Sequence, residues 1–200
     1  MKKLGIYLVI IGVTIISFYL LYNKLLDVKN NEDVDTYINK TSVIDEQPKI
    51  VEEIKKEKST KLNSDIQYTA ILEIPKINLK RGVIDSTKNF KSINYAISVD
   101  NSSQYPNKKG NFILYSHSGN SSIAFFNKLN QVEEKDDIYV YFNGIKYHYK
   151  VVKKYDIEKI GKAKVINSIE NKYITLITCN QNRKDYQIVI EGKIVDEITY

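Results

Sequence analysis

The chain has 200 residues, which fits one domain with accessory segments, and its 42% hydrophobic and 27% charged content is typical of a folded protein. The net charge of +6 raises the question of an anionic partner, such as nucleic acid, a cell wall or a lipid surface. The lysines are scattered, however, and form no stripe or nucleic-acid recognition motif, so we interpret them as solubilising charges and exclude a nucleic-acid partner.

The first predicted element is an apolar helix over residues 4–22, a run without a charged residue. At 1.5 Å per residue such a helix spans roughly 28 Å, close to the hydrocarbon thickness of a bilayer. The run is too long for a cleavable signal peptide and lacks an A-x-A-like cleavage site, which favours an uncleaved signal anchor over a buried core helix. Lys2 and Lys3 favour a cytoplasmic N-terminus for residues 1–3 and an extracytoplasmic location for the remainder.

Residues 23–66 are rich in Lys, Glu, Asp and Asn and show no sustained alternation. Such a composition cannot bury enough apolar surface to offset the entropy lost on ordering. Glu52 and Lys56 form an i,i+4 pair that could support a marginal helix. We therefore predict a polar extracytoplasmic stalk that lifts a domain off the membrane.

The remaining segment, residues 67–200, is predicted to be an all-β domain. Sixteen tyrosines and frequent Ile, Val and Thr favour strands, and Asn143-Gly144 between two alternating runs is a strong hairpin signal. Residues 122–131 are the one convincing helix, and the unpatterned residues 156–171 are a candidate functional loop. Many short strands suggest a barrel or a sandwich. The predicted strands are 68–74, 110–117, 137–142, 145–155, 172–178 and 185–194.

Cys179 is the only cysteine, so outside the membrane it has no intramolecular disulfide partner. Considered alone, an idle thiol is the favoured interpretation. A reactive cysteine needs a neighbour that stabilises its thiolate, and histidine can do so and can later protonate a leaving amine. His148 alternates with tyrosines inside a predicted strand and is expected to be structural, whereas His117 ends an apolar strand where a loop opens.

Arg183 follows Cys179 by four residues and is one of two arginines in a lysine-rich chain. Acyl transfer to a thiol creates an oxyanion, which a fixed cation or amide donor stabilises. Arginine suits that task because it stays charged and presents a rigid fork of donors. A plain surface charge is the alternative interpretation for Arg183.

These motifs together resemble the sortase family, the membrane-anchored cysteine transpeptidases of Gram-positive bacteria. "TLITCNQNR" resembles the family's TLxTC motif with its downstream arginine, and "FILYSHSG" resembles the histidine strand. "AILEIPKINLKRGV" and "FFNKLNQVEEKDDIYVYFNGIKYHYKV" resemble the opening strands and the segment after the histidine. The resemblance covers about residues 67–194 and includes the N-terminal anchor.

The resemblance implies a closed eight-stranded β-barrel with one or two short helices, preceded by a transmembrane helix. Cys179 would end one strand and Arg183 would start the next. The implied activity is cleavage of an LPxTG-like sorting signal on secreted proteins through a thioacyl-enzyme, followed by transfer to an amine of the cell wall. His117 would act as general acid and base, Arg183 would hold the substrate or the oxyanion, and Thr178 and Ser116 would support the oxyanion site.

Several positions depart from the family's pattern. Ser116 stands where a glycine usually precedes the histidine, and "NQNR" follows the cysteine in place of Thr-Pro. No second apolar run follows the domain, and the loop 156–171 is short for the haem-uptake class. These features favour class D or another non-pilin class.

No cofactor is expected. Some members of the family bind calcium through acidic loop residues, but a solvated turn is the better interpretation of the acidic cluster formed by Glu133, Glu134, Asp136 and Asp137. Two other functions are weighed beside the transpeptidase: a membrane-anchored cysteine protease with water as acceptor, and a non-catalytic surface binding module.

Overall fold

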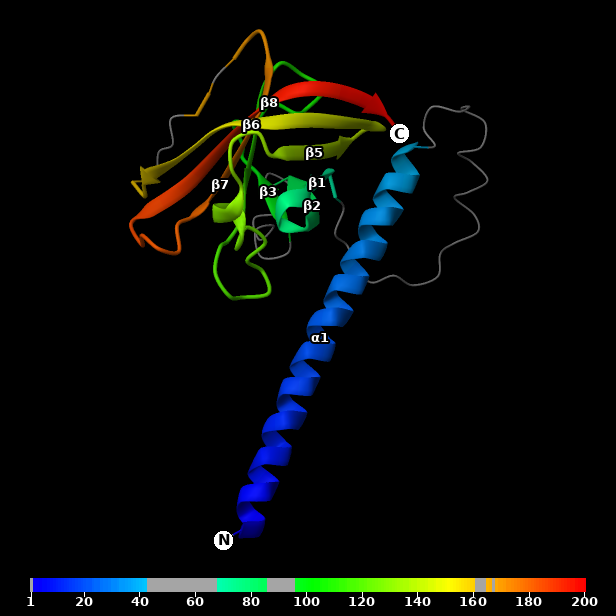
Figure 1. Cartoon of the computed structure of the whole chain (residues 1–200). Coiled ribbons are helices and arrows are strands. Elements are labelled where there is room, and N and C mark those ends of the chain that lie inside the picture. The colour runs from blue at the N-terminus through cyan, green and yellow to red at the C-terminus, as the bar shows by residue number, and fades with distance from the viewer. Residues whose placement is uncertain (1, 43–67, 86–95, 161–164, 167) are drawn as a thin grey trace, which may run out of the picture.

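The computed structural model describes residues 2–42, 68–85, 96–160, 165–166 and 168–200. They form one long N-terminal helix, α1 (Lys2–Ser42), and a closed barrel of eight strands (Figure 1). The prediction of an all-β barrel preceded by an apolar helix is therefore confirmed.

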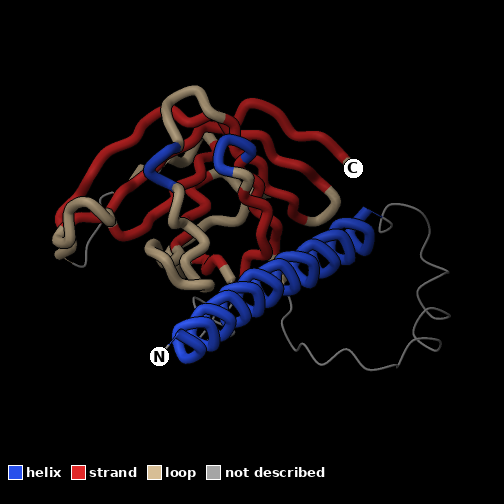
Figure 2. Tube along the Cα trace, turned by 60° about the horizontal axis from the view of Figure 1, so that its bottom comes forward, coloured by secondary structure: helices blue, strands red, loops and turns tan. Residues whose placement is uncertain are grey.

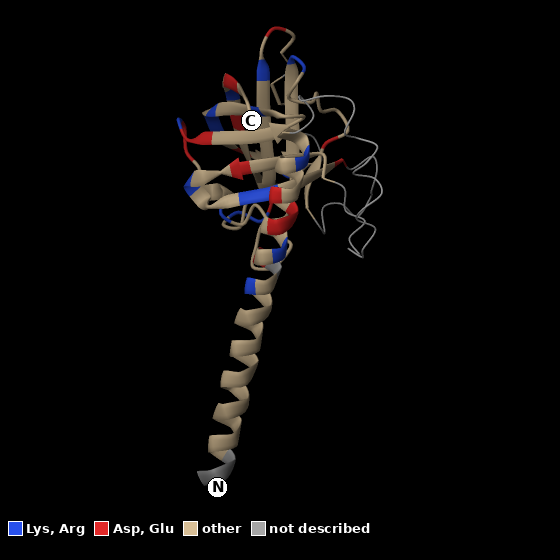
Figure 3. Ribbon diagram, turned by 90° about the vertical axis from the view of Figure 1, so that its right-hand side faces the viewer, with Lys and Arg blue, Asp and Glu red and all other residues tan. Residues whose placement is uncertain are grey.

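The N-terminal half of α1 is apolar and projects away from the barrel (Figures 1 and 3). By length and composition this helix could cross a membrane, a test that signal sequences also pass. A core helix of a soluble protein would be buried, but none of the apolar window is buried in this structure. That observation argues against the core-helix alternative for the described part of this run, residues 5–22.

The C-terminal half of α1 runs along the barrel beside β1 (Ala70–Ile74) and β2 (Leu79–Asp85), as the tube view shows (Figure 2). The first part of the predicted stalk, residues 23–42, is thus helical, whereas residues 43–66 with the Glu52–Lys56 pair lie outside the described residues. The helix already formed by the apolar half needs no new nucleus, and contacts with the barrel stabilise its continuation.

The helix contacts the barrel through a stripe of five residues spaced three or four apart, as expected for one face of an α-helix. Asp27 pairs with Arg81 at 2.6 Å, and Asn30 Nδ2 donates to the Lys80 carbonyl at 3.2 Å. Val34 is 2% exposed. Closer to the helix end, the Tyr37 hydroxyl donates to the Thr69 carbonyl at 2.7 Å, and Thr41 and Tyr200 share a hydroxyl–hydroxyl bond of 2.7 Å.

The barrel strands follow the order β1-β2-β3-β4-β7-β8-β6-β5 and close between β5 and β1. The β2–β3 and β4–β7 pairs are parallel, and the other pairs are antiparallel. Alternate side chains fill the interior, for example Phe112, Leu114, Ile174 and Leu176. The remaining strands are β3 (Ile97–Val99), β4 (Gly110–Tyr115), β5 (Asp137–Phe142), β6 (Ile145–Glu158), β7 (Lys172–Cys179) and β8 (Tyr186–Thr199).

The hairpin predicted at Asn143-Gly144 is confirmed, because Phe142 pairs with Ile145 and both turn residues have positive φ, 51° and 77°. Two positive φ values are the requirement of a type I′ turn, which Asn-Gly meets at low cost. The opening β1–β2 hairpin turns through a 3₁₀ segment, η2 (Pro75–Ile77), and Asn78 in the left-handed region.

The helix predicted over residues 122–131 is wrong. This stretch forms successive turns and a short 3₁₀ segment, η4 (Leu129–Gln131). Ala124, Phe126 and Leu129 are buried there at spacings of two and three residues, so packing against the barrel overrides the local helical propensity.

A new carboxylate on α1 should destabilise the protein more at a position that contacts the barrel than at an exposed position of the same helix. Val34→Asp places a carboxylate in a buried contact and should lower the free energy of unfolding of the full chain by about 2 kcal/mol or more. Val28→Asp is the matched control, because Val28 is 46% exposed on the same helix. Thermal unfolding in detergent micelles measures both, and equal shifts would contradict docking of the helix on the barrel.

Candidate active site

Cys179 is the last residue of β7 and is half-buried. Along this strand Ile174, Leu176 and Thr178 point into the barrel, as their near-complete burial and the core packing of the first two show. Successive side chains of a strand point to opposite faces. Cys179 therefore lies on the outer face of the barrel, at the strand end.

The parallel pairing of β4 with β7 brings His117 to the same place. The ladder aligns Tyr115 with Ile177, and it continues beyond β4 through the Ser116 N–H to the Ile177 carbonyl (3.4 Å). One step further, Ser118 Oγ donates to the Cys179 carbonyl at 2.6 Å. His117 lies between these two anchors, two residues beyond Tyr115, so its backbone lies beside Cys179 at the end of the ladder.

Ser116 and Thr178 lie on the interior face, alternating with His117 and Cys179. The Thr178 hydroxyl donates to the Ser116 carbonyl at 2.9 Å, and both side chains are buried. Ser116 Oγ is buried without a hydrogen-bond partner among the described residues. Their support of an oxyanion stays a prediction, and here they tie β4 to β7 at the site.

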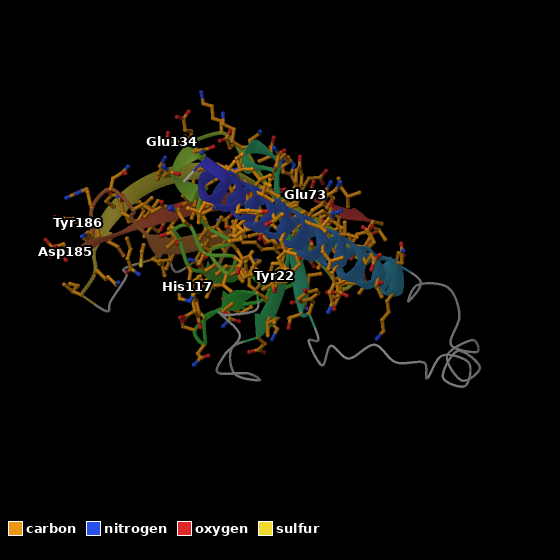
Figure 4. The ribbon with its side chains drawn as sticks, turned by 90° about the horizontal axis from the view of Figure 1, so that it is seen from below. Tyr22, Glu73, His117, Glu134, Asp185 and Tyr186 are labelled. Atoms are coloured by element: carbon orange, nitrogen blue, oxygen red, sulfur yellow. The ribbon has the colours of Figure 1, made fainter. Side chains whose placement is uncertain are left out.

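Arg183 lies in the turn between β7 and β8, and β8 begins at Tyr186. The expectation that Arg183 starts that strand is therefore wrong, because the chain first reverses through a turn closed by the Tyr186 N–H to the Arg183 carbonyl (2.9 Å). The guanidinium donates to Asp156 Oδ2 at 3.0 Å and stacks 3.4 Å from the centroid of the Tyr186 ring. His117 lies apart from Asp185 and Tyr186, which mark the tip of the long strands (Figure 4).

The partners of Arg183 place its guanidinium on the face opposite to Cys179. Asp156 pairs with Ile188, and directly opposed residues of a ladder share a face. Ile188 belongs to the interior core, and Tyr186, two residues before it, shares that face. The structure thus leads the backbones of His117 and Cys179 to the same end of the β4–β7 ladder and directs Arg183 to the other side of the sheet.

Gln187 is a residue at the site that the sequence reasoning did not single out. It lies directly opposite Cys179 in the β7–β8 ladder and is half-buried. Correct alignment of the two strands across their turn would have found it.

The predicted functional loop begins later than expected, because β6 extends to Glu158. Its described residue Ile166 is held at both backbone atoms: Asn111 Nδ2 donates to its carbonyl at 2.7 Å, and its N–H donates to Glu191 Oε1 at 3.3 Å. Asn111 and Glu191 are 6% and 2% exposed. Ile166 therefore lies over the outer face of the barrel, upstream of Cys179.

Two further side chains complete this buried polar cluster. Thr175 exchanges hydrogen bonds of 2.9 and 3.0 Å with Asn111. The Tyr155 hydroxyl donates to Glu191 at 2.9 Å, and burial, reinforced by this bond, raises the pKa of Tyr155. Tyr155 thus stays a protonated donor, and Thr175 lies four residues before Cys179 on the same face.

A small pocket opens beside Cys179 at the end of β7. Phe126 and Ile188 form its apolar part, and Asn127 and Asn180 contribute polar groups. Cys179 thus helps to line a small pocket of mixed apolar and polar character at the end of its strand.

Two carboxylates of the acidic cluster near β5, those of Asp136 and Asp137, bond to other groups of the protein. Asp137 contacts Lys150 at 2.8 Å and His148 at 2.7 Å, and the hydrogen bond from Lys150, followed by that from His148, lowers the pKa of Asp137. Asp136 accepts the Glu133 N–H at 2.8 Å. Within the described ranges, no three His, Cys, Asp or Glu side chains are arranged to hold a metal ion.

Comparison with known proteins identifies the family. The family model for the sortase domain matches residues 72–195. The chain belongs to the sortase family. Membership implies a cysteine transpeptidase that acts on proteins with LPxTG-type signals.

Solved sortase structures share the fold at low identity. The Clostridium perfringens sortase D5 transpeptidase matches with a TM-score of 0.58 and 16% identity over 65% of this chain and 80% of that one. Listeria monocytogenes sortase A gives 0.57 and 21% over 66% and 90%, and Actinomyces oris sortase C-1 gives 0.59 and 21% over 66% and 76%. These similar scores do not distinguish the sortase classes. No curated protein matches the chain.

The cluster that holds Ile166 predicts a specific loss of stability. Asn111→Ala removes the partner of Thr175 Oγ1 and of the Ile166 carbonyl, and it should lower the free energy of unfolding by about 1–3 kcal/mol. Asn107→Ala, at an exposed position, is the control. Denaturant unfolding measures the free energy of unfolding of both variants. Equal values would contradict a stabilising role of the hydrogen bonds that Asn111 makes to Thr175 and Ile166.

Proposed function

We propose that the chain is a membrane-anchored cysteine transpeptidase that cleaves an LPxTG-like sorting signal and transfers the protein to an amine of the cell wall. The proposal is supported by the parallel register of β4 and β7, which ends at Tyr115–Ile177 and leads His117 and Cys179 to the same end of the ladder, where Ser118 bonds to the Cys179 carbonyl. Family membership supplies the reaction class, and this placement supplies a nucleophile with a proton carrier next to it.

In the proposed reaction the Cys179 thiolate attacks the carbonyl carbon of the threonine, or its equivalent, in the signal. The C–N bond to the following residue breaks, and His117 gives the leaving amine its proton. The resulting thioester is then attacked by the acceptor amine, whose proton passes to His117, and the Cys179 thiolate leaves. The hydrogen bond from Ser118 to the Cys179 carbonyl fixes the strand end during both steps.

The role of Arg183 can be tested separately from those of Cys179 and His117. Its sequence-based role at the substrate or the oxyanion stays a prediction, and the contacts that the structure does give it support a role in holding the turn after Cys179. Asp156 accepts both from Arg183 and from Asn180 Nδ2 at 3.0 Å. Loss of turnover in Arg183→Lys would support the sequence-based role, because a point charge cannot replace the rigid fork.

The membrane part of the proposal rests on α1. The apolar half would lie in the bilayer with Lys2 and Lys3 on the cytoplasmic side, and the barrel would face the cell wall. Because the polar half of α1 packs along β1 and β2, the barrel would sit close to the membrane surface, and residues 23–42 would not lift it away as the predicted stalk implied. Partners would be secreted proteins with a C-terminal sorting signal and an amine of a wall precursor, and class D or another non-pilin class stays the favoured assignment.

We expect Cys179→Ala and His117→Ala each to abolish turnover of fluorogenic LPxTG-type peptides, since one removes the nucleophile and the other the proton carrier. His148→Ala is the control and should change stability at most, because His148 pairs with Asp137 on another part of the barrel. Activity retained by either of the first two variants would overturn the assignment.

The same assay distinguishes the transpeptidase from its rivals. A transpeptidase should yield a ligated product when an amine acceptor is added. Cleavage that ignores the amine would favour a protease with water as acceptor. No cleavage across the peptide panel, with thiol reactivity unchanged in Cys179→Ala, would favour a non-catalytic binding module.

A further inference from the structure

The β7–β8 ladder places one residue directly opposite Cys179, on the side of β7 away from β4 and His117. Gln187 pairs directly with Cys179 in the register. The neighbouring pair is hydrogen-bonded through the Asn180 N–H and the Tyr186 carbonyl at 2.9 Å. Because the two kinds of pair alternate, Cys179 and Gln187 form a non-hydrogen-bonded pair, in which the Cα atoms are about 4.5 Å apart and the side chains are close.

His117, Cys179 and Gln187 therefore form a row across the ends of β4, β7 and β8, with Cys179 and Gln187 on the outer face and His117 two residues beyond the last residue of β4. Directly opposed residues share a face, and the interior side of the same strands is occupied by other side chains. Thr178 and Ile188, the next pair in the ladder, are 3% and 5% exposed and point inward. The row thus contains one nucleophile, one titratable group and one neutral amide.

We propose that Gln187, rather than Arg183, donates the hydrogen bond that stabilises the oxyanion formed when Cys179 attacks a carbonyl. This inference rests on the proposed Cys179 chemistry. The Gln187 amide carries two N–H donors at Nε2, and an amide donor aimed at a developing oxyanion lowers the barrier.

The other candidate donors are directed elsewhere. The Arg183 guanidinium contacts Asp156 and Tyr186 on the interior-facing side. The Thr178 hydroxyl donates to the Ser116 carbonyl, and Ser116 Oγ is buried in the interior. Gln187 is half-buried on the face of the thiol, so a substrate could reach it.

The test compares two reactions of the same thiol in the full chain in detergent micelles. Acetylation by p-nitrophenyl acetate passes through an oxyanion: the Cys179 thiolate attacks the ester carbonyl, nitrophenolate leaves, and a thioester remains. Alkylation by iodoacetamide displaces iodide at a carbon without an oxyanion. The ratio of the two rates therefore isolates oxyanion stabilisation from the fraction of thiolate, and it needs no sorting signal.

We expect Gln187→Ala to lower this ratio about tenfold or more, as loss of a hydrogen bond to the oxyanion predicts. Gln187→Glu, which keeps the shape but loses both N–H donors, should lower it at least as much. Gln131→Ala, at an exposed position in η4, is the matched control, and Cys179→Ala gives the background from other nucleophiles. An unchanged ratio in Gln187→Ala, or a loss confined to Arg183→Ala, would overturn the inference.

Failure of the proposed function itself has a different signature, since wild-type Cys179 would then be alkylated but not acetylated above the background.

A cross-link tests the geometry without any catalysis. Gln187→Cys should form a disulfide with Cys179 on mild oxidation, because an opposed Cα separation of about 4.5 Å lies within the disulfide range. If Arg183→Cys formed a disulfide with Cys179 more readily than Gln187→Cys does, the placement of Gln187 opposite Cys179 would be contradicted.

Discussion

The parallel pairing of β4 with β7 is the constraint on which the site depends. The two strands are more than sixty residues apart in the sequence, and their ladder from Gly110–Lys172 to Tyr115–Ile177 sets which side chains meet at its end. A slip of one residue would turn either His117 or Cys179 into the barrel, because the side-chain period of a strand is two. Closure of the barrel through β5 and β1 leaves neither strand at an edge where such a slip is easy.

Polar groups buried on the outer face reinforce this register. Asn111 on β4 and Thr175 on β7 bond to each other, and Asn111 and Glu191 hold the two backbone atoms of Ile166. Each of these bonds is costly to break because its partner would be left unsatisfied away from water. The polar cluster lies four residues before Cys179, and the thiol at the end of β7 is half-buried. The scaffold therefore protects the ladder and leaves its end accessible.

The sequence predicted the features that follow from local pattern. Alternation and the Asn-Gly turn located β5 and β6, and the uncharged run located the apolar half of α1. The pairing of Cys179 with His117 was inferred from chemistry and is consistent with the register. The three-residue strand β3 was missed because its pairing is set by neighbours distant in the sequence, and β2 was indicated only by the resemblance to the family's opening strands.

Tertiary contacts decided the rest. Residues 122–131 have a helical pattern in the sequence, but they form successive turns whose apolar side chains pack against the barrel. Arg183 looked close to Cys179 because four residues separate them, yet the turn directs it to Asp156, and Gln187, eight residues away, lies opposite the thiol. Proximity in the sequence was thus a poorer guide than strand register.

The most direct test of the account is the intact mass of the full chain, quenched during incubation with an LPxTG-type peptide panel. The account predicts an acyl adduct on Cys179. Hydroxylamine should remove this adduct, and an added amine should convert it into a ligated peptide. The His117→Ala variant should not accumulate it. Peptide cleavage that persists in Cys179→Ala, or an adduct on any other residue that leads to product, would contradict it.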